Sequence, residues 1–186
     1  MKNSFQKGLT LVEMLIVISI AVLFSAMVFG NYNVGKEGLA LERAAQKLSQ
    51  DLRRAQEMGL SGYFPTGFNA AGLYFDESSP ATSYILYNNS TSDATNYYYQ
   101  SSTDSIRETI NIETGIKICN IIDDDNGSIT YPTTRSVSFA PPEPVTRIEN
   151  DNTLHNVSIV LCIISDNTKT RTININNVGR IDVNNP

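Results

Sequence analysis

The sequence contains few of the residues that catalytic and metal sites need. Its 186 residues include one histidine, two cysteines and no tryptophan. Two cysteines are too few for a disulfide-framework scaffold, and they could make a four-ligand zinc site only with His155 and a carboxylate. The P-loop, H-E-x-x-H and G-x-G-x-x-G patterns are absent. A catalytic triad would also have to use His155, for which a surface or turn position is favoured. The sequence therefore predicts no enzymatic activity and no cofactor.

Basic residues are also scarce. The formal net charge is −5 and the sequence pI is about 4.8. A field of this sign repels phosphate backbones, so a role in binding nucleic acid would need a local basic patch. After Ser61 the acidic residues outnumber the basic ones. The late basic residues Lys169, Arg171 and Arg180 lie among aspartates, which argues against nucleic acid as a partner.

Apolar residues are concentrated near the start of the chain. Residues 1–8 are polar and carry Lys2 and Lys7, whereas residues 9–30 are almost entirely apolar. This run is about as long as the roughly 20 residues that a helix needs to cross a bilayer. The positive-inside rule keeps the two lysines in the cytoplasm. We therefore expect a single-pass transmembrane helix over 9–30, with the rest of the chain outside the cytoplasm.

A removed signal peptide or a plain signal anchor would share this pattern. Phe24 and Ala26 would flank the best cleavage candidate near the end of the run, and a bulky aromatic residue fits such a site badly. An ionised Glu13 inside an apolar helix also requires a cationic partner. Cleavage after Gly8 would supply one, because the new α-amino group of Leu9 would lie one helical turn from Glu13.

Residues 7–18, KGLTLVEMLIVI, resemble the class III leader of type IV pilins and type II secretion pseudopilins. The resemblance implies that a prepilin peptidase cuts between Gly8 and Leu9 and methylates Leu9. It also implies that Glu13 directs filament assembly by contacting the amine of a neighbouring subunit. Leu9 departs from the family, which more often has phenylalanine there, whereas the spacing from Gly8 to Glu13 is intact.

A second helical segment is expected over 31–60. Its apolar positions recur at helical spacing, which predicts packing on the chain's own globular domain. Gly30 and Gly35 could loosen or kink the junction with the first segment, and Gly59 offers a C-terminal stop. The residues of the apolar stripe are Leu41, Ala44, Ala45, Leu48, Leu52 and Ala55.

From Ser61 onward the pattern changes to short strands separated by polar turns. An Asn126-Gly127 pair predicts a tight hairpin, and residues 165–168 are expected to join the last long pair of strands. The fold class is therefore α+β, a long N-terminal helix packed on an antiparallel sheet, with the head at 61–186. Nine strands are expected, at 72–75, 84–87, 109–112, 116–122, 129–131, 137–139, 157–164, 171–175 and 180–183.

Parts of the head, at 67–68, 72–75, 83–87, 136–139 and 178–181, weakly resemble H-type minor pseudopilins and related minor pilins. Cys119 and Cys162 lie in apolar runs and could be free buried thiols or, outside the cytoplasm, a disulfide. The acidic run 123–127 invites a calcium interpretation, but its spacing does not fit an EF-hand, and a hairpin turn is favoured. The polar, tyrosine-rich stretch 87–102 is expected to be a mobile loop, with an adhesive surface as the alternative.

The sequence as a whole predicts a minor pilin or pseudopilin with four segments: leader 1–8, transmembrane helix 9–30, amphipathic helix 31–60 and head 61–186. The partners implied by the resemblance are prepilin peptidase, other pilin or pseudopilin subunits, the inner-membrane assembly platform and membrane lipid. The alternative function is a binding module at a filament tip, for DNA uptake or adhesion.

Overall fold

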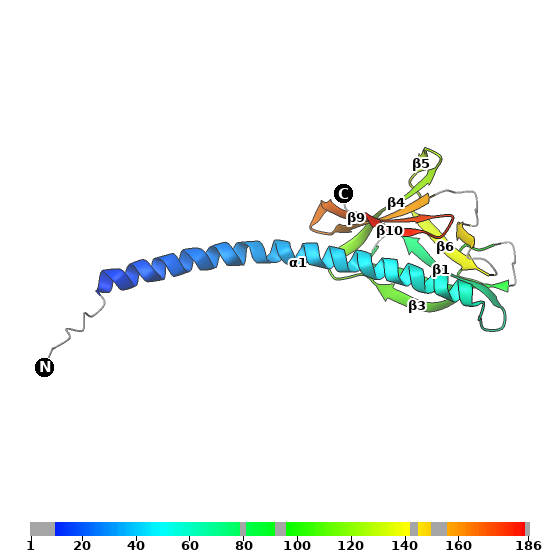
Figure 1. The fold of residues 1–186 in the computed structure, drawn as a ribbon, viewed down its shortest axis with the longest axis horizontal. Coiled ribbons are helices and arrows are strands. Elements are labelled where there is room, and N and C mark those ends of the chain that lie inside the picture. Colours follow the sequence, from blue (N-terminus) through cyan, green and yellow to red (C-terminus); the bar gives the residue numbers. More distant parts are fainter. Residues whose placement is uncertain (1–9, 79–80, 92–95, 142–144, 150–155, 185–186) are drawn as a thin grey trace. The chain divides into compact units, whose positions relative to one another are not determined.

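The computed structural model describes residues 10–78, 81–91, 96–141, 145–149 and 156–184, except for the side chains of 28–34. The chain forms two compact units, Met1–Glu37 and Gly38–Pro186. One helix, α1 (Leu11–Ser61), contributes residues to both units, and all ten strands belong to the second (Figure 1).

Helix α1 contains 51 residues and no proline. The helix continues through Gly30 and Gly35. An isolated glycine inside a helix lowers its stability by only about 1 kcal/mol relative to alanine, so it does not end the helix. The predicted stop at Gly59 is wrong, because α1 continues to Ser61. The residue that follows is Gly62, which adopts a left-handed φ of 61°. Glycine reaches this conformation without a steric penalty, so it commonly terminates helices.

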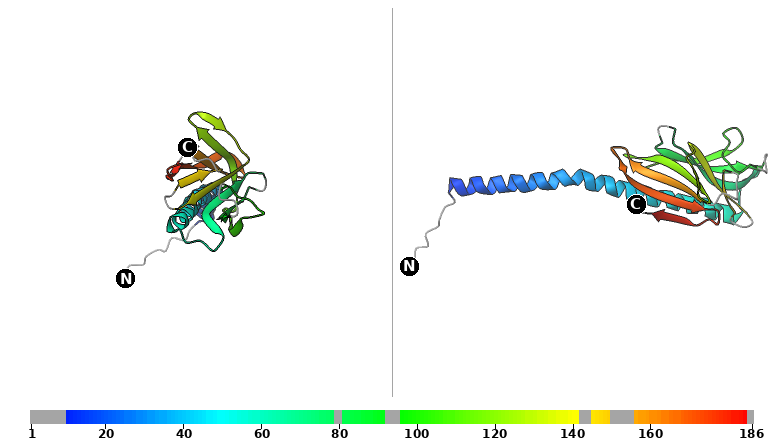
Figure 2. Two further views of the ribbon diagram at one scale, coloured as in Figure 1. Left: turned by 90° about the vertical axis from the view of Figure 1, so that its right-hand side faces the viewer. Right: turned by 90° about the horizontal axis from the view of Figure 1, so that it is seen from above.

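The strands form two antiparallel sheets of five strands each, where the sequence suggested one. Figure 2 shows them from two further sides. The α+β fold class is confirmed. The first sheet has the order β3-β2-β1-β6-β7, with β1 (Phe68–Asp76), β2 (Ser83–Ser90), β3 (Ser105–Asn111), β6 (Thr134–Ala140) and β7 (Val145–Ile148). The second has the order β10-β9-β8-β4-β5, with β4 (Ile116–Asp125), β5 (Ser128–Thr130), β8 (Asn156–Ile163), β9 (Asp166–Asn176) and β10 (Ile181–Asn184).

The two predicted turns have different outcomes. The hairpin at Asn126-Gly127 is confirmed: Asp125 pairs with Ser128, and the two turn residues have φ values of 51° and 92°. Positive φ at both central positions is the geometry for which Asn-Gly is preferred. The turn between β8 and β9 is shorter than predicted, because β9 already begins at Asp166.

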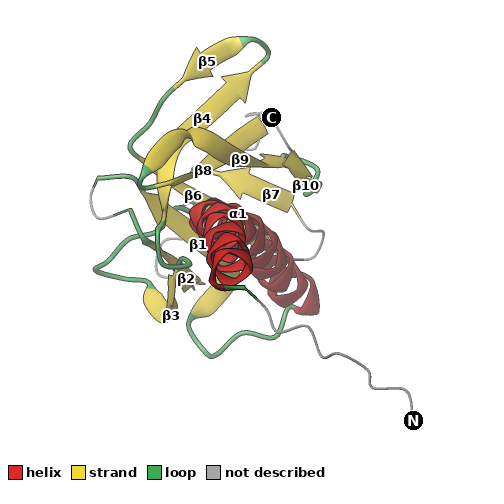
Figure 3. Cartoon of the chain, turned by 90° about the vertical axis from the view of Figure 1, so that its left-hand side faces the viewer, coloured by secondary structure: helices red, strands yellow, loops and turns green. Residues whose placement is uncertain are grey.

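The apolar stripe of α1 packs in the second unit against both sheets (Figure 3). All six predicted stripe residues are buried, which confirms that prediction. Polar contacts surround this packed face. Tyr84 of β2 donates a hydrogen bond to Asp51 at 2.6 Å, and Arg171 of β9 pairs with Glu42 at 2.9 Å. One helical segment therefore closes the core of both sheets. The core residues from the sheets include Leu73, Phe75, Leu86, Val137 and Phe139 of the first and Ile118, Ile121, Ile159, Leu161, Ile173 and Ile175 of the second.

Gly59 lies where α1 closely approaches β6 of the first sheet. A Cβ atom at this position would lie 2.7 Å from both the Cβ and the carbonyl oxygen of Phe139. We expect Gly59→Ala to lower the free energy of unfolding by about 2 kcal/mol, because helix and strand backbones would have to separate. Chemical denaturation of the purified full chain measures this change.

The matched control is Gly38→Ala in the same helix. A Cβ atom at Gly38 meets no atom within 4 Å. This variant should raise the free energy of unfolding by about 0.5–1 kcal/mol, the helix-propensity gain alone. A gain of that size in both variants would contradict a packing role for Gly59.

The tyrosine-rich stretch 87–102 does not form the expected mobile loop: residues 87–90 belong to β2, and the described segment 96–104 packs on the first sheet. Tyr87 donates a hydrogen bond to the carbonyl of Tyr97 at 2.8 Å, and the ring centroids of Tyr87 and Tyr99 are 5.2 Å apart. Asp104 accepts backbone hydrogen bonds from Ser90 and Gln100, each at 2.8 Å. The aromatic side chains therefore cover strand surface and keep the segment in contact with the sheet.

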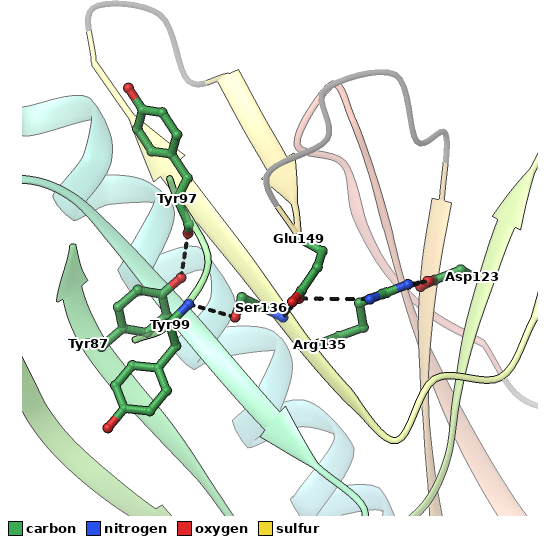
Figure 4. A network of polar contacts seen from close by, with 7 residues as sticks. All are labelled: Tyr87, Tyr97, Tyr99, Asp123, Arg135, Ser136 and Glu149. Atoms are coloured by element: carbon green, nitrogen blue, oxygen red, sulfur yellow. Dashed lines mark hydrogen bonds and ion pairs between the residues drawn. The ribbon is translucent and has the colours of Figure 1, made fainter. Parts of the chain in front are cut away.

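A chain of polar contacts links this segment to both sheets (Figure 4). The backbone N–H of Tyr99 donates to Ser136 Oγ at 2.9 Å, and the backbone N–H of Ser136 donates to Glu149 at 2.9 Å. Arg135 of β6 then pairs with Asp123 of β4, which is 2% exposed. Burial raises the pKa of Glu149 above the ordinary range of glutamate. The Arg135–Asp123 pair is a charged link between the two sheets.

Cys119 and Cys162 form a disulfide between the neighbouring strands β4 and β8. Their Cα atoms are 5.8 Å apart, within the usual span of such bonds. The pairing register shifts between Ile118 and Asn120, so Cys119 is the extra residue of a β-bulge. The bridge therefore lies within one sheet and connects positions 43 residues apart in sequence.

Candidate assembly site at the N-terminus of the helix

The candidate functional site is the first part of α1, in the unit Met1–Glu37. Every described side chain from Thr10 to Met27 is exposed, although most of them are apolar. An apolar surface all round a helix is typical of a segment that is covered by lipid or by other helices. The large exposed side chains are Leu11, Val12, Met14, Leu15, Ile16, Val17, Ile18, Ile20, Val22, Leu23, Phe24 and Met27.

Thr10 and Glu13 form a capping box at the start of this helix. Glu13 Oε2 accepts hydrogen bonds from the backbone N–H and from the hydroxyl of Thr10, both at 2.9 Å. The backbone N–H of Glu13 donates to Thr10 Oγ1 at 3.3 Å. These reciprocal bonds satisfy backbone donors that the first helical turn leaves without partners. Glu13 is therefore held in place by its own chain.

The sequence interpretation assigned Glu13 a partner at Leu9 and did not identify this capping box. The signal was present, because Thr10-x-x-Glu13 before an apolar run is the sequence pattern of such a box. Leu9 and Gly8 lie outside the described residues, so cleavage, methylation and the pairing of Glu13 with an amine stay predictions.

Two serines are the other polar side chains of this segment. Ser19 Oγ donates to the carbonyl of Leu15 and Ser25 Oγ to that of Ala21, each at 2.8 Å. Bonding to the carbonyl four residues earlier satisfies a hydroxyl within its own helix. Such a serine needs no water, so it is compatible with apolar surroundings.

The remaining candidate positions are in the second unit or outside the described residues. His155 lies outside them. In the acidic run, Asp123 is paired with Arg135, and Asp124 accepts the backbone N–H of Gly127 at 2.8 Å and so supports the hairpin turn. Among the residues that the structure describes, no group of three or more His, Cys, Asp or Glu side chains could hold a metal ion.

Among the residues that the structure describes, no helix has the length and apolar character to span a membrane. Leu9 and the side chains of 28–30, which belong to the predicted span 9–30, lie outside the described residues.

Residues 3–29 match the prokaryotic N-terminal methylation motif. The chain is type IV pilin-like at its N-terminus. The match extends from before Gly8 to the end of the exposed apolar segment, so it includes the predicted cleavage position, Glu13 and the capping box. The pilin-like motif and the exposed apolar surface thus occupy the same residues.

No curated protein matches the chain. Among solved structures, the type IV minor pilin FimU of Pseudomonas aeruginosa is similar, with 12% sequence identity and a TM-score of 0.45. The similarity covers 78% of this chain and 88% of the FimU chain.

Proposed function

We propose that this chain is a structural subunit, a minor pilin or pseudopilin, of a type IV pilus or type II secretion pseudopilus. Prepilin peptidase cleaves it between Gly8 and Leu9 and methylates Leu9, and the mature subunit then assembles through its N-terminal helix. The observation that carries this proposal is the coincidence of the methylation motif at 3–29 with an apolar helix exposed on all sides. The role is structural, not enzymatic.

Removal from water stabilises the apolar N-terminal helix at each stage of assembly. The exposed side chains of α1 are covered first by membrane lipid and then, after extraction by the inner-membrane assembly platform, by the helices of neighbouring subunits. Relative to exposure to water, each of these two coverings gains about 25 cal/mol for each Å² of apolar surface. Covering Ser19 and Ser25 costs little free energy, because their hydroxyls already donate hydrogen bonds to the helix backbone.

Glu13 sets the register of assembly. The capping box holds its carboxylate beside Thr10, at the end of the helix where cleavage creates a new amine. The amine of a neighbouring subunit then pairs with that carboxylate in apolar surroundings. An unpaired charge there is costly, so incorrect registers are disfavoured more than correct ones are stabilised.

The head of the subunit lies outside the cytoplasm. The Cys119–Cys162 disulfide supports this location, because such bonds persist in oxidising compartments. Only the N-terminal residues that prepilin peptidase removes remain on the cytoplasmic side.

The test of processing is the intact mass of the chain expressed with and without active prepilin peptidase. The expected product lacks residues 1–8 and carries one methyl group on Leu9. An unchanged N-terminus in the presence of active peptidase would show that the chain is a signal-anchored protein.

Replacement of Glu13 by alanine separates processing from assembly. We expect the Glu13→Ala chain to be cleaved normally, but its amount in sheared filaments should fall about tenfold or more. Loss of the carboxylate leaves one amine unpaired, and a cost of about 1.4 kcal/mol for that amine corresponds to a tenfold fall. Immunoblots of the sheared and membrane fractions measure the distribution.

The matched control is Glu57→Ala, which removes an exposed carboxylate from the other end of the same helix. This variant should enter filaments as the unmodified chain does. Equal incorporation of the Glu13 and Glu57 variants would refute the assembly role of Glu13.

A further inference from the structure

The second sheet carries a polar groove that contains no residue of the N-terminal site. Its volume is about 280 Å³. Four strands of the sheet and the turn between β9 and β10 contribute to it. The lining residues are Asp124, Asn156, Ser158, Asn174, Asn176, Arg180 and Asp182.

The strand register explains why these side chains share one face. Asn174 pairs with Ser158 on one side and Asp182 on the other, so these three form one row across the sheet. Asn176, Asn156 and Asp124 form the next row. The residues that alternate with them along β8 and β9, including Ile159 and Ile173, are in the buried core. The polar side chains therefore belong to the opposite, outer face.

Hydrogen bonds inside the groove orient its planar groups. Ser158 Oγ donates to Asn174 Oδ1 at 2.7 Å, and Arg180 Nε donates to Asp182 Oδ2 at 2.6 Å. Each group keeps further capacity, because the Asn174 amide has two N–H donors, Asp182 a second oxygen and Arg180 four other N–H donors. The groove therefore presents both donors and acceptors to a ligand.

The chemistry of this lining excludes several classes of ligand. No lining residue is apolar, so an apolar ligand would leave polar groups without partners. Two carboxylates against one guanidinium make the groove acidic, which disfavours phosphates and nucleic acid. A neutral ligand with many hydroxyl groups fits this lining, since adjacent hydroxyls both donate and accept and so match planar amide, carboxylate and guanidinium groups.

We propose that this groove binds a saccharide of one or two rings. Its volume lies just below the range of about 300–1,000 Å³ that small-molecule sites occupy, which limits the ligand to that size. No aromatic ring lines the groove, so the affinity is weak, with a Kd on the order of 1 mM. Such a site would let each subunit exposed on a surface contact glycans, and it goes beyond the proposed assembly function.

The experiment is an NMR titration of the isotope-labelled full chain in a detergent without a sugar headgroup. The probes are the methyl glycosides of glucose, galactose, mannose and N-acetylglucosamine, each added to millimolar concentrations. The expected result is saturable shift changes confined to the amides of the groove for at least one glycoside. Both Asn174→Ala and Asp182→Ala should weaken that binding by about tenfold, as expected for the loss of a pair of ligand hydrogen bonds.

The matched control is Asn120→Ala, which removes an exposed asparagine of β4 that does not line the groove. It should bind as the unmodified chain does. The spectra themselves show whether each variant is folded. Absence of shifts with all four glycosides, equal binding by the Asn174 and Asn120 variants, or stronger shifts with inorganic phosphate would each overturn the proposal. Because none of these outcomes depends on Gly8 or Glu13, failure here leaves the assembly function untouched.

Discussion

Replacement of Arg135 by methionine is expected to lower the free energy of unfolding by about 3 kcal/mol. Arg135 of β6 holds the carboxylate of Asp123, which is 2% exposed in β4. Methionine keeps most of the side-chain volume but leaves that carboxylate buried without a cation. Breaking one side of a buried pair costs several kcal/mol, because the remaining charge has lost both water and partner. Chemical denaturation of the purified full chain measures the loss.

Two further variants identify the cause of this loss. Arg54→Met breaks the pair with Glu108, whose two side chains are 47% and 46% exposed, and it should cost at most about 1 kcal/mol. The double variant Arg135→Met/Asp123→Leu removes both charges and should recover most of the stability that the single variant loses. If the double variant is as unstable as Arg135→Met alone, the buried charge is not the cause.

Removal of the disulfide is expected to have an effect of similar size. The Cys119–Cys162 bridge closes a loop with a sequence separation of 43. In the chain-entropy account, a loop of this length stabilises the folded state by about 4 kcal/mol, because the unfolded chain loses freedom. The variant Cys119→Ala/Cys162→Ala should lose up to that amount, which denaturant unfolding measures.

Comparison with the reduced chain separates the bridge from the packing of the two side chains. Unmodified protein treated with dithiothreitol retains both sulfur atoms but lacks the bond. We expect reduction to account for most of the loss seen in the double alanine variant. A reduced chain as stable as the oxidised one would show that packing of Cys162, which is buried, carries the effect.

Strands were predictable where apolar residues alternate over at least three positions. Nine of the ten strands in the described residues overlap a predicted one, including β4 and β8 with their long apolar runs. The exception is β7 (Val145–Ile148), which has four residues and two apolar side chains. Its apolar residues Val145 and Ile148 are three positions apart and so do not alternate. The segment forms a strand because β6 offers it a hydrogen-bonding edge.

The candidate site was predictable because its signal is local. The apolar run, the position of Glu13 and the small residue at Gly8 are read directly from consecutive residues. The capping box is equally local, since Thr10 and Glu13 are one turn apart. In contrast, the polar groove combines β4, β8, β9 and β10, and no stretch of sequence contains enough of it to indicate a site.

The sequence by itself determined the type IV pilin-like N-terminus, the apolar stripe of α1 and the Asn126-Gly127 hairpin, because each depends on residues within a few helical turns or one turn of chain. Only the tertiary structure decided that the strands divide into two sheets around one helix, that Arg135 reaches Asp123 and that the bulge at Cys119 faces β8. These features join residues far apart in sequence, and their pairing depends on register and close packing, which local patterns do not specify.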